Sequence, residues 1–288
     1  MTTRQTISTV LLAGLAITFS ACGDRETGNG SGGNSSSANT KPQPEEPKVA
    51  EGWGELTLRF VYDGAAPMPR KLPLSGADAP HCAKHAPLDE SLLVDAGGGL
   101  ANVIVYLRPG SGDTVKVHPD YEQLAGQPVK LTNKQCAFTP HVLTLWTRRP
   151  LVVSNDDTLG HNTKADLTIN DAFNEQISPG KSITKHMSRS ERRPVKFVCN
   201  SHPWMSGYLL VRDNPYMGVS ATDGTLTIRN IPSGHWKFGV WHERFGNLVE
   251  VEQNGKHVLW SKGIVKLTIQ PGKSNPIEIK VNPKHYGL

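Results

Sequence analysis

The chain is poor in cysteine and in long hydrophobic runs, and each shortage excludes a class of protein. Four cysteines among 288 residues are too few for a miniprotein built on disulfides. The apolar run Val10–Ile17 is too short to cross a bilayer as a helix. Because 28 glycines and 21 prolines punctuate the chain, a helical bundle is disfavoured, and no Gly-X-Y period indicates collagen. The remaining composition, 37% hydrophobic and 20% charged, is typical of a folded globular protein.

The chain also lacks a basic surface patterned for nucleic acid, although its net charge is +5. The densest basic cluster contains Arg189, Arg192, Arg193 and Lys196, with Glu191 inside it. No zinc-finger, RNA-recognition or helix-turn-helix pattern accompanies this cluster. We therefore predict no nucleic-acid partner and interpret the cluster as a solvated basic face, with attraction to an acidic protein as the alternative.

The first 21 residues are typical of a secretion signal. Arg4 supplies the positive charge that precedes the apolar stretch Val10–Ile17. The sequence Phe19-Ser-Ala-Cys22 resembles the lipobox of bacterial lipoproteins, although Phe19 stands where an aliphatic residue is usual. This resemblance implies cleavage before Cys22 and acylation of its sulfur, so that a membrane would hold the mature chain by lipid.

Residues 22–50 are rich in Gly, Ser, Asn and Pro and contain no large apolar residue before Val49. This composition predicts a flexible linker between the lipid and a folded body. We therefore expect a periplasmic or cell-surface, membrane-tethered lipoprotein, or a secreted protein if Cys22 is not acylated.

From Trp53 onward the sequence predicts an all-β protein. No helical period extends over eleven residues, whereas short runs of alternating or buried apolar character recur between Asp-Gly, Asn-Gly and Pro-Gly turns. The predicted strands are 55–62, 102–107, 129–131, 141–145, 151–154, 195–199, 208–211, 225–229, 235–241, 265–269 and 277–281. Many short strands at this spacing favour β-sandwiches.

One loop between two predicted strands has the side chains of a copper site. Cys199, His202 and Met205 follow one another at a Cys-x2-His-x2-Met spacing, so all three can reach one ion. A thiolate, a weak thioether and two imidazoles form the ligand set of blue-copper electron-transfer sites. The second imidazole is available from His161, which follows the predicted strand 151–154. Zinc also accepts Cys and His but rarely a thioether, so Met205 favours copper.

Two motifs carry a family resemblance. They are Asn155-x5-His161-Asn162 and Cys199-x2-His-Pro-Trp-Met205-x-Gly207. Together they resemble the type 1 blue-copper cupredoxins, especially amicyanin, pseudoazurin and plastocyanin, over residues 115–213. The resemblance implies a Greek-key β-sandwich with one copper ion at one end.

The resemblance also assigns roles to residues. It implies that His161, Cys199 and His202 are equatorial copper ligands and that Met205 is the axial one. It implies that four neighbours support these ligands without binding copper: Asn155, Asn162, Pro203 and Trp204.

By the same resemblance, the edge of His202 would lie at the surface and serve as the point where the electron enters and leaves. Trp204 then either forms part of a docking patch around that edge or seals the site from water, and we favour sealing.

The function expected from this site is the transfer of single electrons between a redox donor and a redox acceptor. No His-x-His pair and no further cysteine at binuclear spacing occurs, so the sequence encodes one mononuclear site and no evident substrate position. We therefore expect a carrier and not an enzyme. The alternatives are copper storage or delivery by the same residues, and a structural surface module whose copper site has lost its function.

Cys82 and Cys136 remain after Cys22 and Cys199 are assigned. In an oxidising compartment the default expectation is a disulfide between them. The rival interpretation is a second metal site at His81-Cys82-x2-His85, joined by Cys136 or His141.

A second β module surrounds the first in sequence. Residues 51–110 and 214–288 contain alternating strands, Asp223-Gly224 and Pro232-x-Gly234. Joined end to end, they resemble the transthyretin-like module found beside carboxypeptidases, also called carboxypeptidase regulatory-like. The cupredoxin would then be inserted into a discontinuous sandwich; alternatively, 214–288 forms the module alone. The combination resembles a group of bacterial proteins labelled methylamine utilisation proteins.

Overall fold

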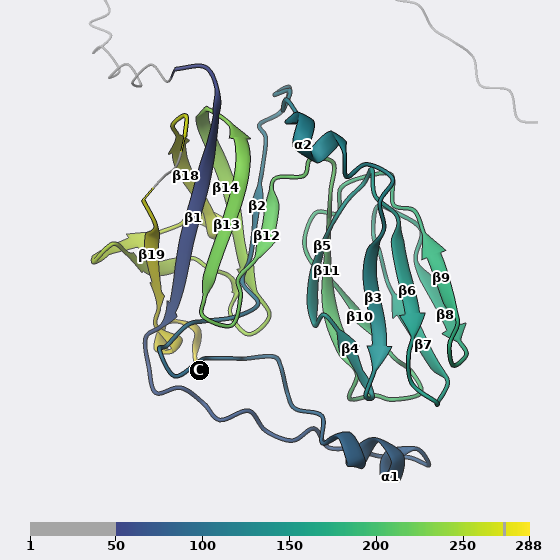
Figure 1. The fold of residues 1–288 in the computed structure, drawn as a ribbon. Helices are drawn as coiled ribbons and strands as arrows, with labels where there is room; N and C mark the ends of the chain where they lie inside the picture. The colour runs from purple at the N-terminus through teal and green to yellow at the C-terminus, as the bar shows by residue number, and fades with distance from the viewer. Residues whose placement is uncertain (1–49, 273–274) are drawn as a thin grey trace, which may run out of the picture. The chain divides into compact units, whose positions relative to one another are not determined.

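The computed structural model describes residues 50–272 and 275–288, which belong to one compact unit. The expected signal peptide, Cys22 and the expected linker up to residue 49 lie outside the described residues. None of the helices within the described ranges is both long and apolar enough to cross a membrane. Strands make up nearly all the regular structure, so the fold is all-β, as predicted (Figure 1).

The first sandwich combines strands from both ends of the described chain. One sheet has the order β13-β1-β19-β16-β17, and the other has the order β12-β2-β14-β15 with β18 paired to β14. Its strands are β1 (Trp53–Tyr62), β2 (Ile104–Leu107), β12 (Met217–Val219), β13 (Thr225–Pro232), β14 (Gly234–His242), β15 (Gly246–Asn247), β16 (Glu250–Gln253), β17 (Lys256–Leu259), β18 (Ile264–Ile269) and β19 (Ile277–Val281).

Strand β1 shows why the two ends of the chain share a sheet. Its alternating sequence turns Leu56, Leu58 and Phe60 inward, where each is at most 3% exposed. β1 pairs antiparallel with β13 and parallel with β19, so its inward side chains complete a core made mainly by residues beyond 216.

The second sandwich is formed by consecutive strands between β2 and β12. Its sheets have the orders β5-β11-β10-β7-β8 and β4-β3-β6-β9. Its strands are β3 (Val129–Lys134), β4 (Ala137–Thr139), β5 (Val142–Trp146), β6 (Leu151–Asn155), β7 (His161–Ala165), β8 (Phe173–Ile177), β9 (Ser182–Lys185), β10 (Val195–Val198) and β11 (Ser206–Arg212). Neighbours distant in sequence, such as β5 and β11, require connections that pass between the sheets, as in a Greek key.

The helices are single turns. They are α1 (Ala79–Cys82), η1 (Ala83–His85), α2 (Pro119–Glu122), η2 (Ser261–Gly263) and η3 (Pro283–Tyr286). Proline in the first turn starts α1, α2 and η3, where its missing N–H costs no helical hydrogen bond. α1 and η1 lie in residues 63–98, which we call the covering segment.

The two sandwiches meet through a small apolar cluster and through polar contacts beside it. Ile104 and Tyr106 of β2 are buried against Val142 of β5 and Leu210 of β11. Nearby, His141 Nε2 lies 2.6 Å from a carboxylate oxygen of Glu243, with both side chains largely buried. These contacts hold the strands of the two modules in one unit.

The basic cluster is organised around a buried acid. Arg189, Arg192 and Arg193 are exposed, as expected, but Glu191 is 0% exposed. Its carboxylate accepts hydrogen bonds from the backbone N–H groups of residues 168, 169 and 170 at 2.9–3.2 Å, and from the hydroxyl of Thr168 at 2.8 Å. Burial raises the pKa of Glu191, but the hydrogen bonds from Asn170, Thr168 and Ile169 outweigh burial and lower it to about 2.

This lowered pKa predicts an acid-sensitive contribution to stability. The carboxylate stabilises the fold fully above its ordinary pKa of 4.5, and the contribution disappears as the pH falls toward 2. Glu191→Gln should lower the free energy of unfolding at pH 7 by up to about 3 kcal/mol and flatten its pH dependence below pH 5. Urea unfolding at several pH values measures both effects.

The matched control is Glu175→Gln, which removes a partly exposed partner of Lys185. It should change stability by less than about 1 kcal/mol. Parallel pH profiles for the wild type and Glu191→Gln would contradict the assigned role of Glu191.

Candidate metal centre

The pairing of β7 with β10 brings the two ligand-bearing loops together. The strands are antiparallel, with Val198 opposite Lys164 and Phe197 opposite Ala165. The first residue of β7, His161, therefore lies at the same end of the sheet as Cys199, which directly follows β10. The next turn returns to β11 and places His202 beside them.

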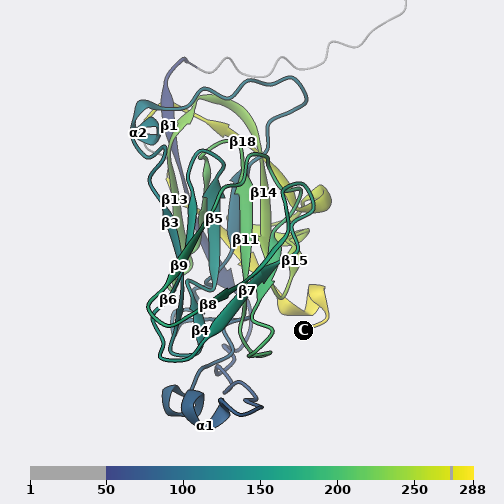
Figure 2. The ribbon, with the colours of Figure 1, turned by 90° about the vertical axis from the view of Figure 1, so that its right-hand side faces the viewer.

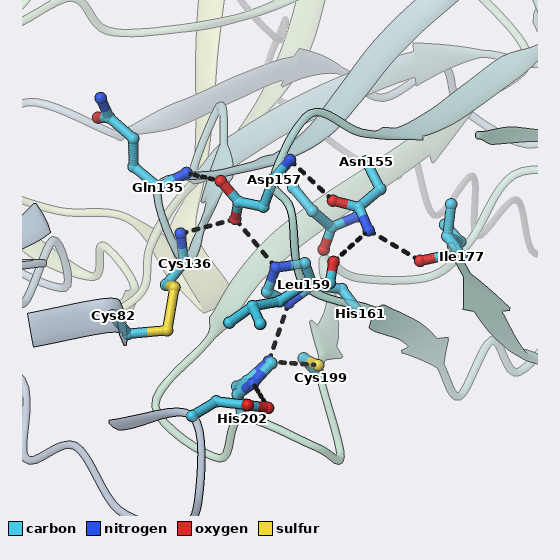
Figure 3. A network of polar contacts seen from close by, with 12 residues as sticks. Cys82, Gln135, Cys136, Asn155, Asp157, Leu159, His161, Ile177, Cys199 and His202 are labelled. Atoms are coloured by element: carbon cyan, nitrogen blue, oxygen red, sulfur yellow. Dashed lines mark hydrogen bonds and ion pairs between the residues drawn. A yellow bond between two sulfur atoms is a disulfide. The ribbon is translucent and has the colours of Figure 1, made fainter. Parts of the chain in front are cut away.

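Three metal-binding atoms converge at this end. The Nδ1 atoms of His161 and His202 are 2.9 Å apart, and Cys199 Sγ lies 3.6 Å from His202 Nδ1 (Figure 3). All three side chains are at most 1% exposed, and their ligand atoms lie within 4.8 Å of one another. Cys199 is a free cysteine, so its sulfur can act as a ligand.

A carboxylate orients each imidazole. His161 Nε2 lies 2.9 Å from Asp157 Oδ2, and His202 Nε2 lies 3.0 Å from Asp78 Oδ2. Each carboxylate can only accept, so it favours the proton on Nε2 and leaves the Nδ1 lone pair directed inward. Two lone pairs facing each other at 2.9 Å repel unless a proton or a cation lies between them. The residues therefore fit a metal ion between the two rings and the sulfur.

The protonation of His161 agrees with this arrangement. Burial and the nearby His202 lower the pKa of His161, and the opposing effect of Asp157 does not compensate. A neutral ring is the form that donates a lone pair to a metal.

Asn162 ties the two loops around the sulfur. Its backbone N–H points at Cys199 Sγ at 3.4 Å, while its Oδ1 accepts from the N–H groups of Asn200 at 2.7 Å and Ser201 at 3.2 Å. Its Nδ2 donates to Asn174 Oδ1 at 2.6 Å. The side chain therefore holds the loop after β10 against the start of β7.

Asn155 organises the loop before His161. Its Nδ2 donates to the carbonyl oxygens of Leu159 at 2.7 Å and Ile177 at 2.8 Å, and its Oδ1 accepts from Asp157 N at 3.0 Å. Asp157 in turn accepts from the backbone N–H groups of Gln135 and Cys136 (Figure 3). These hydrogen bonds hold the Asp157 carboxylate in the position where it contacts the imidazole of His161.

Met205 and Trp204 close the remaining sides. Met205 is 1% exposed, and its backbone closes the loop through hydrogen bonds with Cys199 and His202. Trp204 is 8% exposed; its ring lies 5.0 Å from that of His202, and its Nε1 donates to Cys136 O. The indole therefore seals the site, while Pro203 is exposed. A pocket of about 310 Å³ is lined by both Trp204 and Met205.

The structure contradicts the expectation that the edge of His202 lies at the surface. His202 is 1% exposed, because Asp78 of the covering segment occupies the position beside Nε2. A disulfide between Cys82 and Cys136, with Cα atoms 5.6 Å apart, fastens α1 to the second sandwich (Figure 3). In the ribbon, α1 lies at the end of this sandwich, below β4 (Figure 2). The Asp78 side chain that contacts Nε2 is itself 45% exposed, so it stands between His202 and solvent on this side.

The histidines of the rival interpretation, a second metal site at His81 and His85, do not form a metal-binding group in the described residues. The rings of His81 and His85 are 5.8 Å apart, and among the described residues no third His, Cys, Asp or Glu joins them. His141 is a hydrogen-bonded histidine between Glu243 and Glu90.

Two contributing residues were not predicted from the sequence. Asp157 lies four residues before His161, and this spacing within the Asn155-Asp-Asp157 run was the available signal. Asp78 is separated from His202 by 124 residues and had no local signal.

Comparisons with known proteins give partial likeness only. No protein-family profile and no curated protein matches the chain. Among solved structures, the copper-containing nitrite reductase of Thermus scotoductus is similar to 45% of this chain at 18% identity and TM-score 0.27, and the chain covers 28% of that enzyme. A purple cupredoxin of Nitrosopumilus maritimus matches 28% of the chain, with 97% of its own length covered, at 20% identity and TM-score 0.24.

Amicyanin of Paracoccus versutus matches 38% of the chain, with 97% of its own length covered, at 14% identity and TM-score 0.27. The sandwich fold rests on the strand pairing described above, and the centre rests on its own geometry.

The hydrogen bonds of Asn162 predict a testable role in the loop. Asn162→Ala leaves the N–H groups of Asn200 and Ser201 without their acceptor. We expect the free energy of unfolding to fall by about 1–3 kcal/mol and the Cys199 thiol to react faster with a thiol reagent. Urea unfolding and mass-spectrometric mapping of the labelled cysteine measure these changes.

Asn174→Ala is the control, because it removes only the outer partner of the Asn162 amide. Equal stability and equal Cys199 labelling in all three proteins would show that Asn162 does not organise the loop.

Proposed function

We propose that the protein binds one copper ion through His161, Cys199 and His202, with Met205 as a fourth ligand, and carries single electrons between a redox donor and a redox acceptor. The observation that supports this most is the buried convergence of two Nδ1 atoms and one cysteine sulfur. Two imidazoles and a thiolate with a weak thioether suit both oxidation states of copper. Copper bound there supplies the one-electron couple Cu(I)/Cu(II).

The surrounding residues favour a site whose geometry changes little when the charge of the centre changes. Asp157 and Asp78 hold the two rings, and Asn162 holds the ligand loop and points its N–H at the sulfur. Asp157 and Asn162 are fixed by further hydrogen bonds, and Asp78 lies four residues before Cys82, which is held by the disulfide. Such support limits the movement that must accompany electron transfer.

We also propose that the protein is an electron carrier and not an enzyme. The three ligating side chains are at most 1% exposed and Trp204 packs on His202, so a substrate has no direct approach to the ion. The Cys82–Cys136 disulfide suits an oxidising compartment such as the periplasm or the cell surface. From the sequence around Cys22 we further propose a lipid anchor on this residue, which would tether the protein to a membrane in that compartment.

One observation favours copper storage or delivery as a second candidate. A carrier usually offers a partner a short path to the metal, but here Asp78 and the covering segment lie over the edge of His202. This covering lengthens the path of an electron to the ion, whereas storage requires only that the ion be held away from solvent. Repeated redox cycling separates the candidates, because a carrier retains its copper in both states.

A Cu(II) titration of the full chain tests the centre. We expect an intense thiolate-to-copper absorption band in the visible range that saturates at one copper per chain and disappears on reduction. Cys199→Ser should abolish the band, and Met205→Leu should shift it, because only the former removes the thiolate.

The control is Cys82→Ser/Cys136→Ser, which keeps all four proposed ligands and should keep the band. A colourless wild type, or a band that survives Cys199→Ser, would overturn the copper proposal. Loss of copper to a Cu(I) chelator within a single redox cycle would favour delivery over electron transfer.

Asp78 offers a separate prediction. Asp78→Ala removes the acceptor beside His202 Nε2, so we expect copper to pass to a competing chelator about 10–100 times more readily than from the wild type. Asp78→Asn keeps an oxygen acceptor and should behave more like the wild type. Equal copper affinity in all three proteins would show that Asp78 does not support the ring.

A further inference from the structure

A second group of metal-binding side chains lies in the first sandwich, in residues that the copper proposal does not use. Glu250 of β16, His257 of β17 and His285 of η3 place one ligand atom each within 4.8 Å of one another. Glu250 Oε1 lies 2.9 Å from His257 Nε2 and 3.3 Å from His285 Nδ1. The two imidazole rings are nearly perpendicular, with centroids 6.1 Å apart.

The β16–β17 hairpin places the first two ligands. Glu252 lies opposite His257, so Glu250, two residues before Glu252, is the diagonal neighbour on the same face. The turn between the strands uses Asn254 and Gly255, both with positive φ, which suits a tight antiparallel connection. The register of the hairpin therefore directs both side chains to one side of the sheet.

The third ligand is held by its neighbour in sequence. The hydroxyl of Tyr286 accepts from the N–H groups of Val249 and Glu250 at 3.0 and 3.1 Å and donates to Glu250 O at 2.9 Å. These bonds attach η3 to the start of β16. His285 is consequently beside Glu250 although 35 positions separate them in the chain.

The ligand set defines the class of ion. Two imidazoles and one carboxylate form a common protein site for Zn²⁺, with water in the remaining position, and Cu²⁺ accepts the same donors. Ca²⁺ and Mg²⁺ prefer oxygen donors and are disfavoured by the imidazoles. The three side chains are between 34% and 60% exposed, so an ion can reach them from solvent.

The surrounding charges are compatible with a cation. The nearby carboxylate of Glu252 is already paired with Lys280 at 3.0 Å, which leaves Glu250 as the anionic ligand. A surface His–Glu ion pair contributes little to stability, and one histidine is enough to form it. Ion pairing alone therefore does not account for two histidines from separate elements beside Glu250. We propose that Glu250, His257 and His285 bind one divalent transition-metal ion of the Zn²⁺ type, distinct from the buried centre.

Calorimetric titration of the full chain with Zn²⁺ tests this proposal. The wild type should bind one Zn²⁺ more than His257→Ala/His285→Ala, or bind that ion at least about tenfold more tightly. Glu250→Gln should weaken the same event while preserving the shape of the side chain. The matched control, His186→Ala, removes an exposed histidine of the second sandwich and should leave the titration unchanged.

The buried centre must be counted separately, because its cysteine and histidines can also accept Zn²⁺. Cys199→Ser should therefore retain the event that His257→Ala/His285→Ala removes. Failure of the copper proposal would not affect this result, since the two sites share no residue.

A second readout reports the location directly. Once the buried centre has been filled with one equivalent of Cu²⁺, a further substoichiometric addition should broaden the NMR signals of the His257 and His285 rings before those of His186. Identical Zn²⁺ titrations of the wild type and the double variant, or equal broadening of all exposed histidines, would overturn the proposal.

Discussion

The antiparallel pairing of β7 with β10 is the constraint on which the buried centre depends. It brings the beginning of one strand and the end of the other to the same edge, so that His161 meets the loop of Cys199 and His202. Neither loop alone contains enough ligands to enclose an ion. Asn162, the second residue of β7, then joins both loops through its own hydrogen bonds, which couples the strand register to the geometry at the sulfur.

The covering segment changes what the centre can do. It leaves β1 in the first sandwich, is fixed to the second by the Cys82–Cys136 disulfide, and returns to β2. Its Asp78 carboxylate both orients the ring of His202 and closes its edge to solvent. The same residue therefore supports the ligand and restricts access to it. A redox partner would have to approach through this segment or from another face of the second sandwich.

Strands with a strong apolar pattern were predictable. β1, β2 and β14 have a short buried apolar run or clear alternation, and each was found close to its expected bounds. β8, β9 and the β16–β17 hairpin were not predicted, because their side chains are mostly polar and few of them are buried. Such strands form because neighbouring strands supply their hydrogen bonds, and this information is absent from their own sequences.

The sequence by itself determined the chemistry of the ligand loop. Cys199, His202 and Met205 are so close in the chain that a single turn brings them together, whatever surrounds it. Only the tertiary structure decided that His202 is buried, that Asp78 faces it, and that Glu250, His257 and His285 meet. These contacts join segments far apart in the chain, so they depend on strand register, on sandwich packing and on the disulfide that directs the covering segment.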